Sequence, residues 1–186
     1  MSYVDELLDA YRRFLSLPWQ QHLAGPQRVW MAVYPPEYER RLRLQLPAFK
    51  EATIEHGHPW ALIDITTSFE GWMADHPYRD TYFEEPELLT TALPGFFDHL
   101  VDDTRAQLAM HHAPNGVVGL LGSGALFGLG DSIKVSALLN SVNDAVTGRL
   151  LVFFPGEHEG NSYRLLDARD GWNYLAIPIT PKGGGR

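Results

Sequence analysis

An uninterrupted apolar run at residues 150–154, ended by Pro155 and Gly156, constrains the fold of this chain more than any other feature. Five consecutive apolar residues suit a β-strand covered on both faces, since a strand with one face in water would alternate apolar and polar residues. Doubly covered strands belong to parallel sheets with helices on both sides. We therefore predict a central strand at residues 150–154 that stops at the Pro-Gly pair.

A polar segment follows this strand, and the sequence becomes more apolar again at residues 163–166. We predict a loop here that holds carboxylates, an imidazole and a guanidinium near the carboxyl end of the strand. Ligands of open α/β sheets usually bind at that edge. The side chains that we expect to contact a partner are Glu157, His158, Glu159, Asn161 and Arg164.

Predicted strands and helices alternate through most of the chain. Further strands are expected at residues 28–34, 60–66, 116–121 and 174–179; helices are expected after Ser2, at residues 36–56, after Thr67 or Ser68, and at residues 87–110 and 133–146, with an irregular stretch at residues 75–86. Because neighbouring parallel strands need crossovers, this alternation predicts a three-layer α/β fold with a mainly parallel sheet of about five strands and helices on both faces. We expect a single domain over residues 1–180 and a disordered tail at residues 181–186.

Two predicted elements leave alternatives open. Pro47 should kink or interrupt the helix at residues 36–56, and the alternating leucines at residues 42–46 also fit a strand. Pro178 favours an edge position for the last strand. The turn region at residues 167–172 would also allow that strand to pair antiparallel with its predecessor.

A glycine-rich segment at residues 122–130 lies between a predicted strand and a predicted helix, the context of loops that bind phosphate through backbone amides. The residues that would serve in such a loop are Gly122, Ser123, Gly124 and Gly128. The spacing differs from a dinucleotide-binding fingerprint because Phe127 stands at the third glycine position, and no Gly-Lys-Ser/Thr triplet follows. A tight turn with glycines at positive φ is the structural alternative.

The first predicted strand is followed by Pro35, Pro36 and Glu37, where nucleotide hydrolases carry their phosphate loop. Two prolines remove two amide donors, and the glutamate adds a negative charge. Such a loop would repel a triphosphate. We therefore expect the fold to resemble a degenerate nucleotide-hydrolase-like fold without a P-loop.

Residue types that catalyse reactions are present, but they match no complete motif. The histidines and carboxylates at residues 56–58, 111–112 and 157–159 are metal-ligand types, and each group alone supplies too few ligands. Ser123 lacks the Gly-x-Ser-x-Gly context of a hydrolase nucleophile. A hydrolase or nuclease that uses Asp64, Glu157 and His158 around a metal is the least favoured alternative. We predict no catalytic residue, no metal and no cofactor.

Composition excludes several classes of function. The 186 residues contain no cysteine, so disulfides and thiolate metal sites are excluded, and the formal net charge of -8 disfavours direct binding of nucleic acid. We interpret the cluster Arg40, Arg41 and Arg43 as a solvated helix face. The five tryptophans are expected mainly in the core, with any exposed aromatics available to a protein partner. The sequence shows neither a secretory signal nor a membrane span, so we expect a cytoplasmic protein.

Several longer motifs run through the chain. They are Val-Tyr-Pro-Pro-Glu at residues 33–37, Val-Gly-Leu-Leu-Gly-Ser-Gly at 118–124 before Ser-Ala-Leu-Leu-Asn at 136–140, and Leu-Val-Phe-Phe-Pro-Gly-Glu at 151–157 with Gly-Asn-Ser-Tyr-Arg-Leu at 160–165, continued by Asn173, Tyr174 and Ile177. Together they resemble the BrxB family of bacteriophage-exclusion (BREX) defence systems. The last motif is the most specific, and it departs from the family pattern at His158, where an aromatic such as tyrosine is expected.

The resemblance implies a non-enzymatic component encoded beside a methyltransferase, an alkaline-phosphatase-like PglZ protein and a large AAA+ ATPase. It implies that the PglZ-type protein is the first partner, with the ATPase or the methyltransferase as further ones. No catalytic residue carries over from the family. We therefore expect a non-catalytic adaptor in a phage-defence complex. The alternative is a nucleotide-binding regulator that uses residues 122–130.

Overall fold

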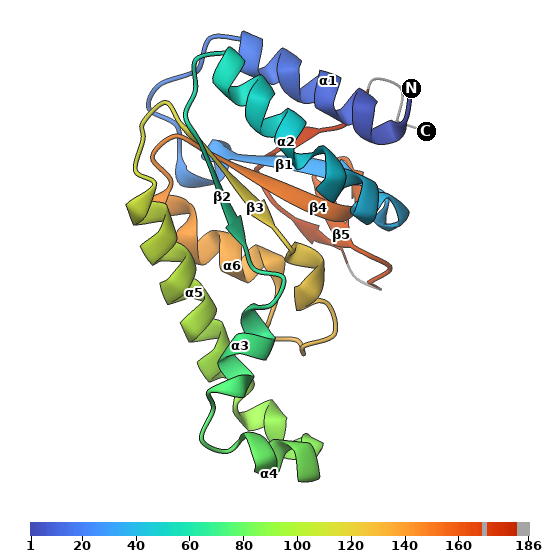
Figure 1. The fold of residues 1–186 in the computed structure, drawn as a ribbon, viewed down its shortest axis with the longest axis vertical. Helices are drawn as coiled ribbons and strands as arrows, with labels where there is room; N and C mark the ends of the chain where they lie inside the picture. Colours follow the sequence, from blue (N-terminus) through green and yellow to red (C-terminus); the bar gives the residue numbers. More distant parts are fainter. Residues whose placement is uncertain (169–170, 182–186) are drawn as a thin grey trace.

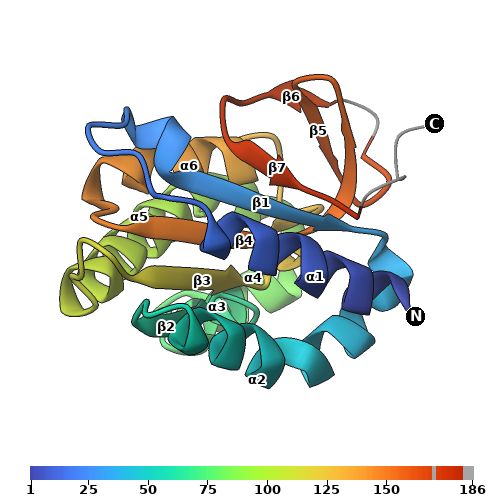
Figure 2. The same cartoon turned by 90° about the horizontal axis from the view of Figure 1, so that it is seen from above.

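The computed structural model describes residues 1–168 and 171–181. In this part of the chain, helices lie on both sides of a mainly parallel sheet, which confirms the predicted α/β architecture (Figure 1). The body of the sheet has the strand order β2-β3-β4-β1-β7, and each strand is parallel to its neighbours (Figure 2). These strands are β1 (Val29–Tyr34), β2 (Trp60–Asp64), β3 (Val117–Leu121), β4 (Arg149–Glu159) and β7 (Ile177–Ile179).

Two groups of helices cover the two faces of the sheet (Figure 1). One face is covered by α1 (Tyr3–Ser16) and α2 (Glu39–Glu55), and the other by α3 (Ser68–Ala74), α5 (Leu93–Met110) and α6 (Val135–Val142). Ser2 caps α1 as predicted, in a capping box with Asp5. The helix α2 is preceded by a 3-10 turn (Pro36–Tyr38) and continues through Pro47, so the proline does not interrupt it.

The core divides at β4, because alternate side chains of a strand point to opposite faces. Leu150, Val152 and Phe154 belong to the cluster under α5 and α6. Leu151 and Phe153 belong to the cluster under α1 and α2. All five are fully buried, so the apolar run forms the doubly covered strand that the sequence predicts.

The end of β4 differs from the prediction. The strand continues past Pro155 and Gly156 to Glu159, and then pairs antiparallel with β5 (Ser162–Leu165). The prediction of a strand that stops at the Pro-Gly pair, followed by a loop, was therefore wrong. Residues 157–159 belong to a β-hairpin, to which β6 (Trp172–Asn173) adds a third strand.

Local geometry explains why the strand continues. Pro155 lies opposite Tyr34, the last residue of β1, so the proline stands where parallel pairing ends and antiparallel pairing begins. Gly156 lies against β5, and a Cβ there would come within 2.1 Å of the Arg164 carbonyl oxygen. A glycine inside a strand marks such a close backbone approach.

The segment between β2 and β3 also differs from the prediction. Residues 75–86, which we expected to be irregular, contain α4 (Arg79–Glu84). The single helix predicted at residues 87–110 is divided into a 3-10 helix, η3 (Pro86–Thr91), and α5. Pro94 lies in the first turn of α5, where the missing N–H has no helical partner to lose.

The C-terminal strand is shorter than predicted and is parallel to β1, so the alternative of antiparallel pairing with β4 was wrong. Pro178 lies in β7 at the edge of the sheet, as predicted. Residues 169–170 of the predicted turn region and residues 182–186 of the predicted tail lie outside the described residues, and Pro181 is buried. No helix in the described part of the chain is both long and apolar enough to cross a membrane.

The junction of β2 and β3 depends on Gly122, which has a φ of 95°. A Cβ on Gly122 would lie 2.6 Å from the backbone nitrogen of Thr66, which follows β2. The backbone is further tied by a hydrogen bond of 2.9 Å from Ile65 N to the Leu121 carbonyl oxygen. A side chain at position 122 would therefore separate the two strand ends.

We expect Gly122→Ala to lower the free energy of unfolding by roughly 3 kcal/mol, because left-handed strain adds to a clash with backbone that cannot move away. Gly128→Ala is the matched control: Gly128 has a φ of 82°, but a Cβ there would meet nothing within 4 Å beyond its chain neighbours. The control should lose about 1 kcal/mol from strain alone. Urea unfolding measures both values, and equal losses would contradict the role of the Thr66 contact.

Candidate functional site

The carboxyl ends of β1, β2, β3 and β4 meet at one edge of the sheet. The chain leaves β1 towards α2 on one face and leaves β3 towards α6 on the other. In doubly wound sheets, ligands bind in the crevice where neighbouring connections take opposite faces. In this fold β4 lies between β1 and β3, and its hairpin extends from that crevice.

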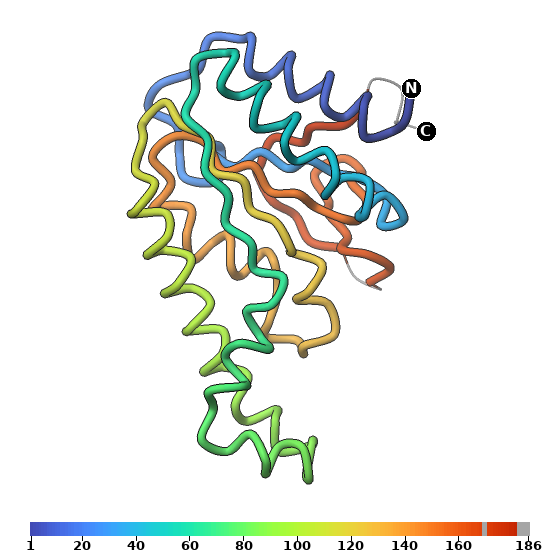
Figure 3. Tube along the Cα trace, viewed as in Figure 1, coloured from blue at the N-terminus to red at the C-terminus, as the bar shows by residue number. Residues whose placement is uncertain are grey.

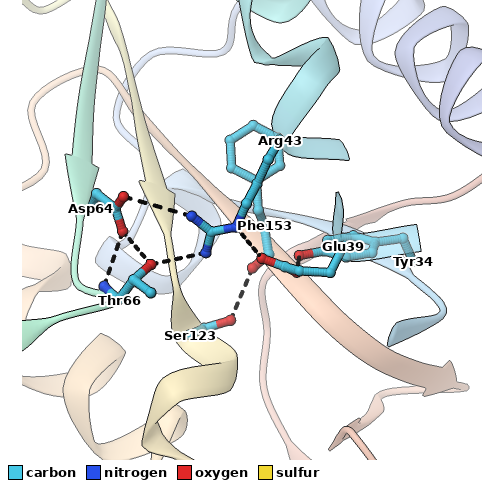
Figure 4. A network of polar contacts seen from close by, with 7 residues as sticks. All are labelled: Tyr34, Glu39, Arg43, Asp64, Thr66, Ser123 and Phe153. Carbon is cyan, nitrogen blue, oxygen red and sulfur yellow. Dashed lines mark hydrogen bonds and ion pairs between the residues drawn. The ribbon is translucent and has the colours of Figure 1, made fainter. Parts of the chain in front are cut away.

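Arg43 of α2 joins the helix to this edge (Figure 4). Its Nε donates to Glu39 Oε1 at 2.8 Å, its Nη2 donates to Thr66 Oγ1 at 2.9 Å, and its Nη1 lies 3.8 Å from Asp64 Oδ2. Only 34% of the side chain is exposed. The prediction of a solvated face was therefore wrong for Arg43, whereas Arg40 and Arg41 are exposed.

Tyr34 at the end of β1 extends this network into the core. Its hydroxyl donates a hydrogen bond to Glu39 Oε2. Burial raises the pKa of Tyr34 well above its usual value of 10, and the hydrogen bond and the negative charge of Glu39 raise it further. The hydroxyl is thus protonated over the physiological range, and Glu39 lies between a neutral donor and the Arg43 cation.

Asp64 closes the other side of the network. Its Oδ1 accepts hydrogen bonds from the backbone nitrogen of Thr66, at 2.9 Å, and from the Thr66 hydroxyl. Asp64 therefore meets Arg43 and Thr66 rather than Glu157 and His158. Within residues 1–168 and 171–181, no group of three carboxylates or histidines has the arrangement of a metal site.

The glycine-rich segment does not bring its predicted residues together on one surface. Ser123 begins a short 3-10 helix (Ser123–Leu126), is buried, and donates from Oγ to the Phe153 carbonyl oxygen at 2.9 Å. Gly124 lies against Pro155, since a Cβ there would be 3.1 Å from the proline Cγ. Gly128 is exposed farther along. Ser123 therefore anchors the segment to β4.

A pocket of about 530 Å³ lies beside the exposed end of this segment. Its walls include Phe127, Lys134 and Trp172, and the carboxylates of Asp131 and Asp167 also line it. Sequence reasoning missed this pocket because Trp172 reaches it through the pairing of β6 with β5, which no local pattern predicts.

The hairpin carries all five of the predicted partner-binding residues. Glu157 and Arg164 lie opposite each other in the register and form an ion pair, with 64% and 43% of their side chains exposed. The centroid of the His158 ring lies 4.6 Å from that of the buried Tyr163 ring, and burial lowers the pKa of His158, which favours the neutral imidazole. Glu159 and Asn161 are exposed near the turn.

Comparison with known proteins adds no relative. No family model, no curated protein and no solved structure matches this chain. The likeness to the BrxB family and the likeness to nucleotide hydrolases stay predictions from the sequence.

Sequence reasoning did not identify Arg43 and Glu39 as residues of the sheet edge. Their spacing of four residues is typical of an ion pair on a helix, and this signal was available. The contacts of Arg43 with Thr66 and Asp64 depend on the packing of α2 beside β2, which spacing alone does not give.

We expect stability to fall above pH 10, because Tyr34, like the buried Tyr11 and Tyr163, must stay protonated in the folded state: burial raises the pKa of each hydroxyl. A folded pKa above the unfolded value contributes stability that is fully present below pH 10 and is lost as the pH rises towards the folded pKa. Tyr34→Phe should cost about 1 kcal/mol at pH 7 through the lost hydrogen bond and should make the alkaline decline shallower, because Tyr11 and Tyr163 still contribute to it. Tyr78→Phe, on an exposed ring, is the control.

Urea unfolding between pH 7 and pH 11 measures this dependence. A Tyr34→Phe variant with the same alkaline slope as the unmodified chain would contradict the assignment of the decline to Tyr34.

Proposed function

We propose that this chain is a non-catalytic interaction component of a BREX-type anti-phage defence complex, acts in the cytoplasm, and binds a PglZ-type, alkaline-phosphatase-like protein. The observation that carries the proposal is the hairpin of β4 and β5. The motif most specific for the BrxB likeness, at residues 151–157 and 160–165, coincides with this hairpin and the buried strand that supports it. A family signature that coincides with an exposed structural unit fits a role in recognition.

The arrangement of the sheet edge supports a binding role over catalysis. Polar side chains that a hydrolase would direct at a substrate are engaged with one another. Arg43 bridges Glu39, Thr66 and Asp64, and Ser123 bonds to the backbone of β4. These contacts stabilise the strand ends that support the hairpin.

The surface charge indicates the kind of partner. The formal net charge is -8, and acidic surfaces speed encounter with basic partners. The AAA+ ATPase and the methyltransferase of such a locus are further candidate partners. Direct binding to nucleic acid is disfavoured by the same charge.

Co-expression with a PglZ-type protein from the same genome tests the proposal. We expect the two proteins to co-purify at a fixed ratio through affinity and size-exclusion steps. Separate elution of two folded proteins would contradict the proposed function.

A charge swap separates the contribution of the hairpin to partner binding from its contribution to the stability of the fold. Arg164→Glu places like charges opposite each other and should cost about 0.5–1 kcal/mol, and adding Glu157→Arg should restore that stability. If the hairpin contacts the partner, the swapped pair should restore the melting temperature without restoring co-purification. Unchanged binding by both variants would remove these two residues from the contact surface.

The pocket beside the glycine-rich segment favours a second candidate, a nucleotide-binding regulator. Its volume of about 530 Å³ suits a small ligand. Phe127 and Trp172 offer aromatic faces to a base, and Lys134 offers a positive charge to a phosphate. Asp131 and Asp167 would oppose the phosphate, which ranks this candidate below the adaptor.

Thermal-shift measurements with ATP, GTP, NAD and cyclic nucleotides test this second candidate. A ligand present at about 100 times its dissociation constant stabilises a folded protein by about 2.7 kcal/mol, so a clear rise in melting temperature is expected if one of them binds. Lys134→Ala should reduce the rise. No rise with any of them would remove the candidate.

A further inference from the structure

Residues 75–91, here called the arm, extend away from the sheet and its helices (Figures 1 and 3). The arm follows α3 and contains α4 and η3, which pack on each other before the chain enters α5. None of the residues of α4 or η3 is buried. The arm is therefore an ordered projection without a core of its own.

Large apolar side chains of the arm lie in water. The exposed fractions are 63% for Tyr78, 71% for Phe83 and 38% for Leu88. An isolated helix as short as the six residues of α4 is marginal in water, and most helical stability in proteins comes from packing an apolar face. A helix of this length with its phenylalanine exposed is the arrangement expected where another surface completes the packing.

The charge of the arm indicates what that surface carries. Asp75, Asp80, Glu84, Glu85 and Glu87 are all exposed, and Arg79 is the single lysine or arginine among residues 75–91, with His76 counted as neutral. Five negative charges against one positive charge leave -4, half of the net charge of the whole chain. A complementary partner therefore combines apolar side chains with lysine or arginine.

The base of the arm offers a place for one such cation. A pocket of about 500 Å³ is lined there by Trp72, His76 and His99 and by the carboxylates of Asp75 and Asp103. An indole face attracts a cation, and nearby carboxylates add to the attraction. The His76 ring connects the pocket to the arm, since its centroid lies 4.8 Å from that of Trp72 and 5.1 Å from that of Tyr82.

We infer that the arm is the docking surface for a protein partner whose contact region is basic and apolar. Phe83, Tyr78 and Leu88 supply the apolar contact, the surrounding carboxylates select a basic region, and a lysine or arginine of the partner enters the pocket at Trp72. This inference rests on the proposed function, in which the partner is the PglZ-type protein. Anionic surfaces such as nucleic acid are repelled by the same carboxylates.

The test uses biolayer interferometry to measure the affinity of the full chain for the PglZ-type protein used in the co-expression experiment. Phe83→Ser and the triple reversal Glu84→Lys, Glu85→Lys, Glu87→Lys should each weaken binding roughly tenfold or more, the size of effect typical of a central interface residue. The reversal changes the formal charge of the arm from -4 to +2, so it should also slow association, and added salt should no longer slow the association further. The side chains changed are exposed, so the melting temperature should stay unchanged.

The controls change another exposed apolar side chain and two other exposed glutamates, all outside the arm. Leu44→Ser alters a side chain of α2 that is 74% exposed, and the pair Glu51→Lys, Glu55→Lys reverses exposed charges on the same helix. These controls should bind as the unmodified chain does. Loss of binding in the controls to the same extent as in the arm variants would overturn the inference. The loss would then depend on the total charge or the exposed apolar area of the chain, and not on the arm.

The outcomes separate the inference from the proposed function. Failure of the unmodified chain to bind overturns the proposed function and this inference together. Binding that is tight in the unmodified chain and equally tight in the arm variants overturns the inference alone. Sedimentation of the chain by itself tests whether a second copy of the chain occupies the arm instead. A dimer that Phe83→Ser converts to a monomer would show that it does, and would overturn the inference of a basic partner.

Discussion

The pairing of β4 with β1 on one side and β3 on the other is the constraint on which the rest of the structure depends. The parallel register with β1 runs from the pair Val29 and Leu150 to the pair Tyr34 and Pro155. Because side chains of β4 alternate between two buried clusters, the strand supports both faces of the sheet at once. A change in its register by one residue would move each side chain into the wrong cluster.

The continuation of β4 also occupies part of the sheet edge at which ligands of such folds usually bind. The parallel pairing of β1 with β4 ends at Pro155, and β4 continues as a hairpin through the crevice between the two sets of connections. Arg43 and its partners tie α2 to the end of β2 across the same edge. The polar groups of this edge thus stabilise the fold, and the exposed groups lie farther out, on the hairpin and on the arm.

Much of this fold could be predicted from the sequence, and the failures have physical causes. The buried strands were recognisable because doubly covered strands are continuous apolar runs. The hairpin was missed because Pro155 and Gly156, taken alone, predict the end of a strand. The strand continues past them because residues 156–159 pair with β5, and this pairing is not visible in the local sequence. The helix α4 was missed because it buries no residue and so has no apolar period. Arg43 was misread because its partners Asp64 and Thr66 are distant in sequence.

The hairpin and the arm both lie on the face of the sheet that α5 and α6 cover. The hairpin continues β4, and the arm follows α3, which comes after β2. In the sheet β3 alone separates β4 from β2, so these two strands lie about 10 Å apart by ordinary strand spacing. Tyr163 and Leu165 of the hairpin belong to the cluster that also contains the side chains of α5, and Phe69 and Trp72 of α3 pack against that cluster. Both features therefore leave the sheet on the face of α5 and α6. The hairpin is held by a backbone ladder, whereas the arm is held by ring contacts at His76, by the packing of α4 on η3, and by Leu89 of η3, which packs against the core cluster. A partner laid along this face would cover the exposed ring of Phe83, so part of its binding energy would appear as stabilisation of the arm.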